Sequence, residues 1–349
     1  MQGKCGLFHT TYAQEARFFQ SGFQKFSLGL FLAVLLASPL VLSNYQLSML
    51  NMINIGVIGA VSLNLLTGCC GQISLGSGAF MAVGAYGAWN VIMRVPGMPL
   101  IGALLLGGVF AALFGVLFGL PSLRVKGLYL AIATIAASFI AHFLFANLAI
   151  TGGTGGISMQ PARVFGIDLD TSFRLYWLIV PVMVLMLLGA ANLFRTRIGR
   201  AFIAIRDCDI SAEVLGIPLL RYKLLSFAIS SFYAGVAGGM WAYFFRSIGP
   251  ESFTLVESIF YLAAVIVGGM GSILGGIIGA TFMTLVPEIL RFGVEAVSPY
   301  IDNAGTLLSP VRTVVFGALI ILFLVFEPQG LAEIVQRVRR FFHLWPFRK

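Results

Sequence analysis

The sequence predicts an all-α integral membrane protein, a polytopic helical bundle of about ten transmembrane segments (range 8–10) with glycine-broken helices. Of its 349 residues, 59% are hydrophobic and only 10% are charged, whereas a soluble domain carries about 25% charged residues. Such a chain has too few polar side chains to cover a water-facing surface. Apolar runs of about 18 to 25 residues recur along it, and each is long enough to cross roughly 30 Å of hydrocarbon.

The first element is a polar stretch, residues 1–25, which we expect to be a cytoplasmic tail. An apolar run follows over residues 26–43. A cleaved signal peptide also combines a basic start with an apolar run. This polar stretch is long, however, and many further spans follow, so we favour an uncleaved first span.

The lengths of the apolar runs, and the charged, Gly and Pro residues that interrupt them, predict the later spans. They are expected near residues 47–66, 79–93, 100–120, 127–149, 175–193, 224–245, 258–280, 281–292 and 306–326. A re-entrant hairpin is the alternative over 258–292, because glycines interrupt this region and its second span is short. The predicted permease domain therefore covers residues 26–326, and residues 327–349 form a basic cytoplasmic tail.

The basic residues predict how the chain is oriented. If both termini are cytoplasmic, 16 of the 22 Lys and Arg residues lie on the cytoplasmic side, as the positive-inside rule requires. We therefore expect an even number of crossings and a multi-pass protein of a bacterial inner (cytoplasmic) membrane. The net charge of +9 reflects this orientation and not nucleic-acid binding, because the basic residues lie in short loops and tails.

An enzyme is the least supported class of function. The chain has no glycine-rich phosphate loop of the GxxxxGK type, so we do not expect it to hydrolyse ATP. No His, Cys or Glu cluster has metal-ligand spacing, and the four cysteines give no disulfide framework. These cysteines are Cys5, Cys69, Cys70 and Cys208. We expect this chain to bind no cofactor and no metal.

A first glycine-rich segment, residues 67–78 (TGCCGQISLGSG), lies between two apolar runs. Glycine permits left-handed or unwound backbone, and such backbone is tolerated at membrane depth where it is buried or lines a cavity. We interpret the segment as part of a substrate pathway, with Gln72, Ser74 and Ser77 presenting polar groups. Close helix packing through small residues, or a simple loop, is the alternative. The candidate pathway residues here are Gly68, Gly71, Gln72, Ser74, Gly76 and Gly78.

A second segment, residues 267–279, interrupts an apolar run in the second half of the chain. Paired interruptions in two halves point to a transport site. The likeness between residues 71–76 and 271–276 is weak, so the two segments are analogous and do not establish a repeat. The candidate pathway residues here are Gly268, Gly269, Gly271 and Ser272.

A third segment, residues 151–157 (TGGTGGI), follows the fifth predicted span on the outer side. A flexible outer loop and a mobile contact at the outer mouth of a pathway are both open interpretations. Its candidate pathway residues are Thr151, Gly152 and Gly153.

The longest cytoplasmic connection covers residues 194–223. Apolar residues recur in it at i, i+4 and i+7 in two groups, first Ile198, Phe202 and Ile205 and then Ile210, Val214 and Ile217. This period predicts two short amphipathic helices. We expect Asp209 to cap the second helix, and Gly216 followed by Pro218 to end it.

We interpret this connection as a docking element for a cytosolic partner. A helix lying in the membrane interface is the alternative. The candidate coupling residues are Gly199, Arg200, Phe202, Arg206, Asp209, Glu213, Leu215 and Gly216.

Taken in order, these segments resemble the branched-chain amino acid permease family of ABC importers over roughly residues 45–335. The fragments that carry the resemblance are residues 63–80 (LNLLTGCCGQISLGSGAF), 127–134 (GLYLAIAT), 151–157, 199–206 (GRAFIAIR) with 213–217 (EVLGI), and 268–276 (GGMGSILGG). Each fragment alone is a modest signal, and their order makes the resemblance specific.

The resemblance implies a permease subunit that translocates branched-chain or other hydrophobic amino acids delivered by a periplasmic substrate-binding protein. It further implies a homologous second permease subunit and two cytosolic ATPase subunits that use the ATP, all acting at the lipid bilayer without nucleic acid. Residues 199–216 look like the loop by which such permeases seat on the ATPase. Close relatives in this family also carry urea or short amides, which leaves that cargo open.

An ion-coupled secondary transporter is the competing class, because glycine-broken helices suit that mechanism too. Such carriers usually need buried ionisable groups. Few occur within the apolar runs here, chiefly His142, Glu257 and Glu288. The long basic connection over 194–223 instead favours transport driven by a partner.

Overall fold

We describe the protein from a computed structural model. It describes residues 29, 33, 35–95, 97–123, 127–161, 163–164, 167–297, 311, 314–315, 317–318, 320–323, 325–327 and 329–344. The predicted tail 1–25 lies outside the described residues, as do parts of the predicted first span (26–43) and last span (306–326).

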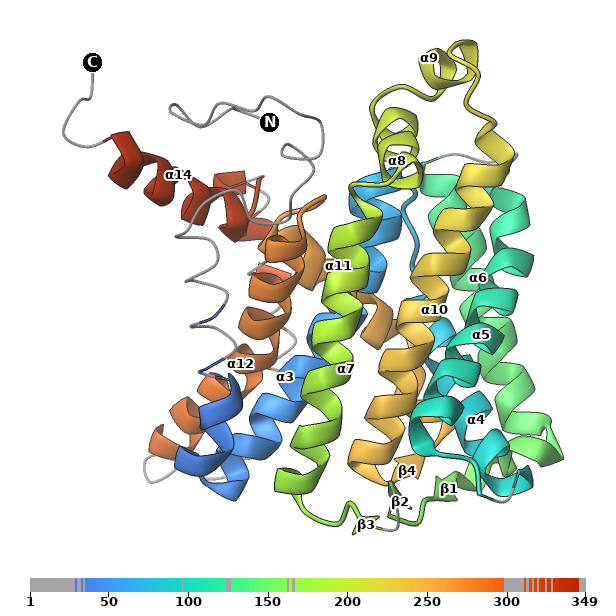
Figure 1. Ribbon diagram of the computed structural model, residues 1–349, viewed down its shortest axis with the longest axis vertical. Helices are drawn as coiled ribbons and strands as arrows, with labels where there is room; N and C mark the ends of the chain where they lie inside the picture. The colour runs from blue at the N-terminus through green and yellow to red at the C-terminus, as the bar shows by residue number, and fades with distance from the viewer. Residues whose placement is uncertain are drawn as a thin grey trace.

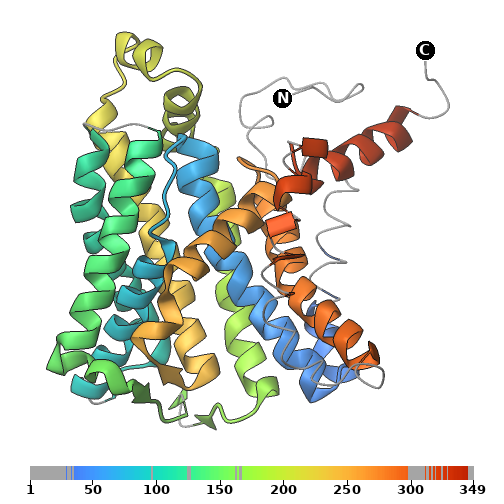
Figure 2. The same ribbon diagram turned by 180° about the vertical axis from the view of Figure 1, so that it is seen from behind.

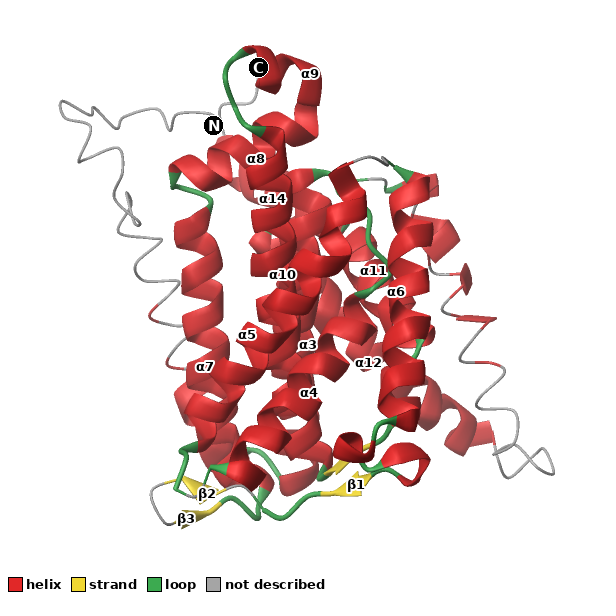
Figure 3. Ribbon diagram, turned by 90° about the vertical axis from the view of Figure 1, so that its right-hand side faces the viewer, coloured by secondary structure: helices red, strands yellow, loops and turns green. Residues whose placement is uncertain are grey.

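The described residues form a helical bundle, with short strands confined to one end (Figures 1 and 3). The α-helices are α3 (Asn44–Leu63), α4 (Ser77–Arg94), α5 (Leu100–Gly119), α6 (Leu128–Asn147), α7 (Ser172–Leu193), α8 (Arg197–Asp207), α9 (Asp209–Val214), α10 (Leu219–Phe245), α11 (Leu255–Gly268), α12 (Ile273–Val297) and α14 (Leu331–Leu344). A π-helix, η1 (Asn64–Cys69), continues α3 directly. The four strands are two residues each and pair antiparallel, β1 (Ile157–Ser158) with β4 (Ser247–Ile248) and β2 (Arg163–Val164) with β3 (Ile167–Asp168).

The two ends of the bundle differ. Helices α8 and α9 lie at one end and the strands at the other (Figure 1). We call the α8–α9 end the inner end, because the charge distribution predicts it to be cytoplasmic, and the strand end the outer end. Helix α14, which falls in the predicted basic tail, also lies at the inner end (Figure 2).

Seven helical segments among the described residues are long and apolar enough to cross a membrane. They are Asn44–Cys69, Leu100–Gly119, Leu128–Asn147, Ser172–Leu193, Leu219–Phe245, Pro250–Gly268 and Ile273–Phe292. The fold is therefore a polytopic helical membrane bundle, as predicted, but the predicted count of about ten segments is not confirmed.

The predicted boundary between the spans 258–280 and 281–292 is wrong. Helix α11 ends at Gly268 and α12 begins at Ile273, so the interruption covers only residues 269–272. Helix α12 is 25 residues long and is not a short segment. The chain reverses here because Gly269 and Gly271 adopt positive φ angles of 113° and 81°, which disfavour any side chain.

Gly275 and Gly279, which looked like helix breakers, lie inside α12 and serve its packing. A Cβ on Gly279 would overlap the Ala264 carbonyl oxygen and lie 2.8 Å from Gly268 Cα. Small residues four apart allow helix backbones to approach this closely. The glycines therefore bring α12 against α11.

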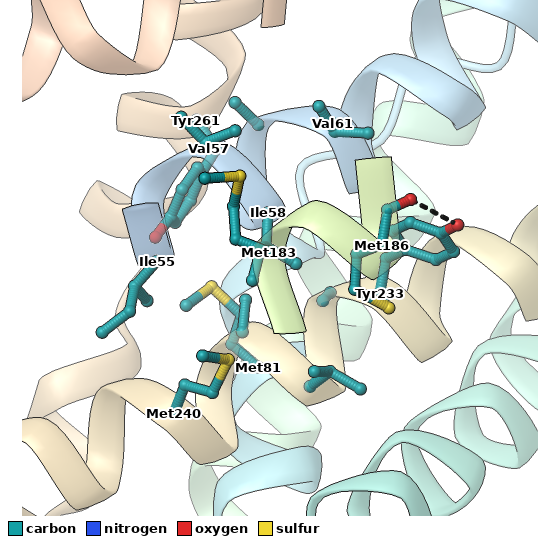
Figure 4. Close-up of a cluster of buried hydrophobic side chains, with 14 of the residues drawn as sticks. Ile55, Val57, Ile58, Val61, Met81, Met183, Met186, Tyr233, Met240 and Tyr261 are labelled. Carbon is teal, nitrogen blue, oxygen red and sulfur yellow. Dashed lines mark hydrogen bonds between the residues drawn. The ribbon is translucent and has the colours of Figure 1, made fainter. Parts of the chain in front are cut away.

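Close approach through glycine also forms the contact of α4, α5 and α10. A Cβ on Gly84 of α4 would overlap the backbone of Gly235 in α10, and one on Gly107 of α5 would lie 3.1 Å from the Ala88 Cβ of α4. Helix α3 and its continuation η1 lie in a second packed region, where 78% of the most apolar 18 residues of Asn44–Cys69 are buried. The side chains of α3 meet those of α7, α10 and α11 there (Figure 4).

Candidate functional site

The first glycine segment departs from α-helix at the inner end of α3. The chain passes through the wider turn of η1 (Asn64–Cys69) and then runs without helix to Gly76. Gly71 has a φ of 71°, which directs this change of course. The Gln72 amide donates to the Leu66 carbonyl at 3.2 Å. π-Helical turns are rare and frequently occur at functional sites, so the prediction of unwound backbone here is confirmed.

Hydroxyl groups of neighbouring helices satisfy the backbone of this segment. The Leu75 amide donates to the Thr134 hydroxyl at 2.9 Å, and the Ser138 hydroxyl donates to the Leu75 carbonyl at 3.3 Å. The Gly78 amide donates to the Ser258 hydroxyl at 2.9 Å. Unwound backbone persists in apolar surroundings only with such partners. Thr134, Ser138 and Ser258 were not among the predicted site residues, and their signal in the sequence is a polar residue within an apolar run.

The side chains predicted to face a substrate are covered by protein. Gln72, Ser74 and Ser77 are all buried. Gln72 Nε2 donates to the Ser226 hydroxyl at 3.3 Å, and Ser74 Oγ accepts from the Gly76 amide at 3.2 Å. Within the described part of the chain, Gln72 Oε1 and Ser77 Oγ are buried without a hydrogen-bond partner. The segment thus carries unused polar groups in its interior.

The second glycine segment meets the first at the inner end. Asn64 Nδ2 donates to the Ser272 carbonyl at 2.6 Å, and the Gly271 amide donates to Asn64 Oδ1 at 2.7 Å. A Cβ on Gly68 would overlap both Asn64 Oδ1 and the Gly271 nitrogen. Two segments about 200 residues apart in the sequence are therefore in direct contact. Asn64 was not among the predicted site residues.

The third glycine segment lies at the outer end and does not join the other two. The Thr151 hydroxyl, which is buried, donates to the carbonyls of Phe145 and Leu148 at 2.6 and 2.7 Å and so terminates α6. Gly152 and Gly153 follow with positive φ angles of 73° and 65°. A pocket of about 400 Å³ is lined by the following residues 154–158 and by residues 247–252.

The predicted coupling loop contains the two expected amphipathic helices, α8 and α9. Two of its candidate residues face the bundle: Phe202 is buried and packs edge-on against Tyr222, and a Cβ on Gly199 would lie 2.6 Å from Phe194 Cα. These residues hold α8 to the bundle, so they are not available to a partner surface.

The opposite face of the loop is exposed and apolar at its tip. Ile210, Val214 and Leu215 are 68%, 83% and 79% exposed, and we call them the α9 patch. Arg200 and Glu213 are also exposed. Helix α9 projects beyond α8, away from the bundle (Figure 1).

The predicted stop of α9 is confirmed and its predicted cap is wrong. Gly216 has a φ of 84°, and the amides of Gly216 and Ile217 donate to the carbonyls of Glu213 and Ala212 at 2.9 and 3.0 Å. This pair of bonds is the Schellman arrangement. Cys208 occupies the N-cap position. Asp209 is the first helical residue, and its carboxylate instead lies 3.8 Å from the ammonium group of the buried Lys223.

Cys208 is an exposed thiol between α8 and α9. The Ser211 hydroxyl donates to its sulfur at 3.2 Å. This hydrogen bond is the main reason that the pKa of the Cys208 thiol is lowered from its ordinary value, because it stabilises the thiolate.

Arg206 connects the loop to the first glycine segment. Its Nη1 donates to the Gly68 carbonyl at 3.0 Å, and its Nε and Nη2 donate to Asp207 Oδ1 at 3.0 and 2.9 Å. Arg206 also lines a pocket of about 360 Å³ with Gly71, Gln72 and Lys223. The predicted coupling residue and the predicted pathway residues thus form one site at the inner end.

The chain is similar to several proteins that are named as transport permeases. The chain matches the family described as "Branched-chain amino acid transport system / permease component" over residues 45–324. It is 33% identical over 333 residues to the "High-affinity branched-chain amino acid transport system permease protein LivM" of Escherichia coli (strain K12), covering 88% of this chain and 75% of that protein. It is 26% identical over 291 residues to the corresponding LivH protein of the same strain, covering 78% and 89%.

A more distant relative has a different name. The "Fructose import permease protein FruG" of Bifidobacterium longum is 27% identical over 294 residues, which cover 77% of each chain. Among solved structures, a chain of PsaBC from Streptococcus pneumoniae in complex with Fab aligns with a TM-score of 0.44 at 15% identity, covering 87% of this chain and 99% of that one. That similarity is too low to support an argument.

The family match includes both touching glycine segments, the outer loop and the whole of α8 and α9. The matched residues therefore include both the inner-end site and the described membrane-spanning helices. The chain therefore belongs to the branched-chain amino acid transport system permease family, and it is a LivM-like permease.

Proposed function

We propose that the chain is the substrate-translocating permease subunit of an ATP-binding cassette importer. The observation that carries this proposal is the exposed α9 patch at the inner end. Exposed apolar patches mark interaction sites, and the projection of α9 away from the bundle favours a cytosolic partner over a membrane interface. We propose that the patch docks on one of two cytosolic ATPase subunits, which use the ATP, and that this chain itself binds no cofactor.

Charged residues around the α9 patch fit the same role. Arg200 and Glu213 are exposed on the two helices of the loop. Rim charges contribute more to register and to the rate of association than to affinity. We propose that they orient the loop in a cleft of the ATPase, while the apolar tip supplies most of the binding free energy.

We propose branched-chain or other hydrophobic amino acids as the cargo, delivered by a periplasmic binding protein. The support is the 33% identity to a protein named as a branched-chain amino acid permease, compared with 27% to one named for fructose. The candidate pathway comprises the touching segments around Gly68 and Gly271, with the Thr151 loop at its outer mouth. The buried polar atoms of Gln72 and Ser77 support this assignment, because they gain partners if the segment opens.

The proposed assembly places this chain beside a homologous second permease subunit in the inner membrane of a bacterium. Both termini are proposed to be cytoplasmic. For the C-terminal side, the support is the location of α14 at the same end as α8 and α9.

Reconstitution tests the proposal. The chain would be placed in proteoliposomes with its second permease subunit and ATPase subunits, and leucine uptake would be measured with binding protein outside and ATP inside. We expect uptake to require ATP and to survive ionophores. Uptake that follows an ion gradient without ATP would favour a secondary transporter, and transport of urea but not leucine would assign the amide cargo.

A further inference from the structure

Arg206 and Asn64 together join the coupling loop to both glycine segments. We propose that they form a latch that transmits movement of α8 to the pathway, and that this latch is closed in the present structure. The proposal rests on the proposed function, since it assumes that an ATPase moves the α8–α9 loop. Neither residue touches the α9 patch, so their role is one of positioning.

The Gly68 carbonyl needs a donor from outside its own helix. It lies in the last turn of η1, and the chain leaves helical geometry at Gly71, so no following amide continues the ladder. The carbonyl end of a helix also carries partial negative charge. The guanidinium of Arg206 satisfies both requirements with its 3.0 Å bond. The coupling loop therefore completes the broken helix.

Arg206 also fits closely against both glycine segments. A Cβ on Gly71 would lie 3.1 Å from Arg206 Cγ, and a Cβ on Gly271 would lie 2.9 Å from Arg206 Nη1. A displacement of α8 thus moves a side chain that contacts Gly68, Gly71 and Gly271 at once.

Asp207 holds the guanidinium in position. It accepts from Nε and Nη2, which leaves Nη1 directed at the Gly68 carbonyl. Only a planar, forked donor can serve these two acceptors in a fixed geometry. Lysine keeps the positive charge but offers a single donor group. An Arg206→Lys substitution therefore keeps the positive charge and removes the forked hydrogen-bond geometry, so it tests the geometry alone.

Asn64 makes the two segments move as one. Its side-chain amide both donates to Ser272 and accepts from Gly271, and it is only 2% exposed. Rotating the side-chain amide would break both bonds, because Nδ2 can only donate and Oδ1 can only accept. If Arg206 shifts η1, Asn64 carries the 271–272 backbone with it.

The closed latch lies where the buried part of the first segment begins: Gly71 is exposed, and the following Gln72 is buried. Arg206, Gly71 and Gln72 line the same inner pocket, and Gln72 is buried while its Oε1 lacks a partner in the described chain. A displacement of Arg206 would remove the side chain that contacts Gly71 and would expose the buried Gln72 to the inner side. Coupling of this kind requires an element with two arrangements that both sites bias, and the latch provides it.

The test uses the complete complex in proteoliposomes with leucine as the cargo. Arg206→Lys and Asn64→Asp are compared with Arg197→Lys, an exposed residue of the same helix. The readouts are ATPase co-purification, ATP hydrolysis stimulated by loaded binding protein, and leucine transported per ATP hydrolysed. For both latch variants we expect co-purification and stimulated hydrolysis to persist, while leucine per ATP falls at least about tenfold. The Arg197→Lys control should keep the wild-type ratio.

Two outcomes would overturn the latch. An unchanged ratio in both variants would show that neither side chain transmits movement. Loss of ATPase binding in Arg206→Lys would make it an interface residue. If Arg206→Lys fails to accumulate in membranes, Asn64→Asp decides alone, because it lies on the far side of the latch from the partner. Absence of ATP-dependent uptake in the wild-type complex would instead refute the proposed function.

Discussion

Replacement of Gly68 by alanine tests whether the two glycine segments touch in the native protein. The added Cβ would overlap Asn64 Oδ1 and the Gly271 nitrogen, and it would lie 3.0 Å from Gly271 Cα. The Asn64 side chain can rotate away only by losing its hydrogen bonds to Gly271 and Ser272. The Gly271 backbone cannot rotate away at all. The segments must therefore separate.

The size of the effect follows from these contacts. Overpacking costs about 1–3 kcal/mol, and each of the two lost hydrogen bonds costs about 1 kcal/mol. We expect Gly68→Ala to lower the free energy of unfolding by about 3 kcal/mol or more. Since about 1.4 kcal/mol is tenfold in an equilibrium constant, this corresponds to roughly 100-fold.

Denaturant titration of the purified protein in detergent measures this difference, with leucine uptake measured in parallel. Gly76→Ala is the matched control for stability, because its φ is −100° and its new Cβ would lie 3.4 Å from Thr134, an ordinary contact. Adding Asn64→Ser to Gly68→Ala removes one overlap but not the backbone one, so stability should recover only in part. Equal stability of Gly68→Ala and Gly76→Ala would refute the close approach.

Four further predictions concern the loop and the first segment. Leu215→Ala should weaken ATPase co-purification by about 2 kcal/mol, as for a central anchor, without lowering the amount of permease in the membrane. Gly216→Val should weaken it as well, because a side chain at φ 84° costs about 1–2 kcal/mol; normal binding by both variants would exclude the docking role. In a background with Cys5 replaced, Cys208 should react with maleimide at a lower pH than an ordinary thiol, and Ser211→Ala should raise its pKa and slow labelling at neutral pH. Gly71→Leu should abolish leucine uptake while membrane insertion persists, because its φ of 71° and its contact with Arg206 both exclude a side chain.

Local signals in the sequence predicted local structure well. The stop of α9 depends on one residue at positive φ and its near neighbours, so Gly216 could be identified from the sequence. The cap of the same helix was misplaced by one residue, because Asp209 is drawn into an ion pair with Lys223 from α10. Helix ends are often ambiguous by one or two residues.

Features that depend on the opposing surface were not predictable in the same way. Gly269 and Gly279 are both glycines in an apolar run, yet one ends a helix and the other packs inside one. The difference lies in the residues that each glycine contacts on the neighbouring segment, and the local sequence does not contain that information. For the same reason the period of α8 predicted an amphipathic helix but did not tell that Phe202 faces its own bundle.

The second glycine segment also contacts the residues at the start of α14. A Cβ on Gly269 would lie 2.8 Å from the Gln329 carbonyl oxygen and 3.2 Å from Ala332 Cβ, and one on Gly330 would lie 2.5 Å from the Gly269 nitrogen. The start of α14 is thus packed against the segment that Asn64 holds from the other side.

Helix α14 is itself amphipathic. The apolar residues of its exposed face are Ile334, Val335, Val338 and Phe341. A helix of this pattern beside a membrane end is suited to lie in the interface. The predicted basic tail therefore includes a helix, α14, whose start packs against the Gly269–Ser272 turn. Arg206 of α8 contacts the same turn at Gly271. If the interface holds α14, a displacement of α8 would move the turn relative to α14.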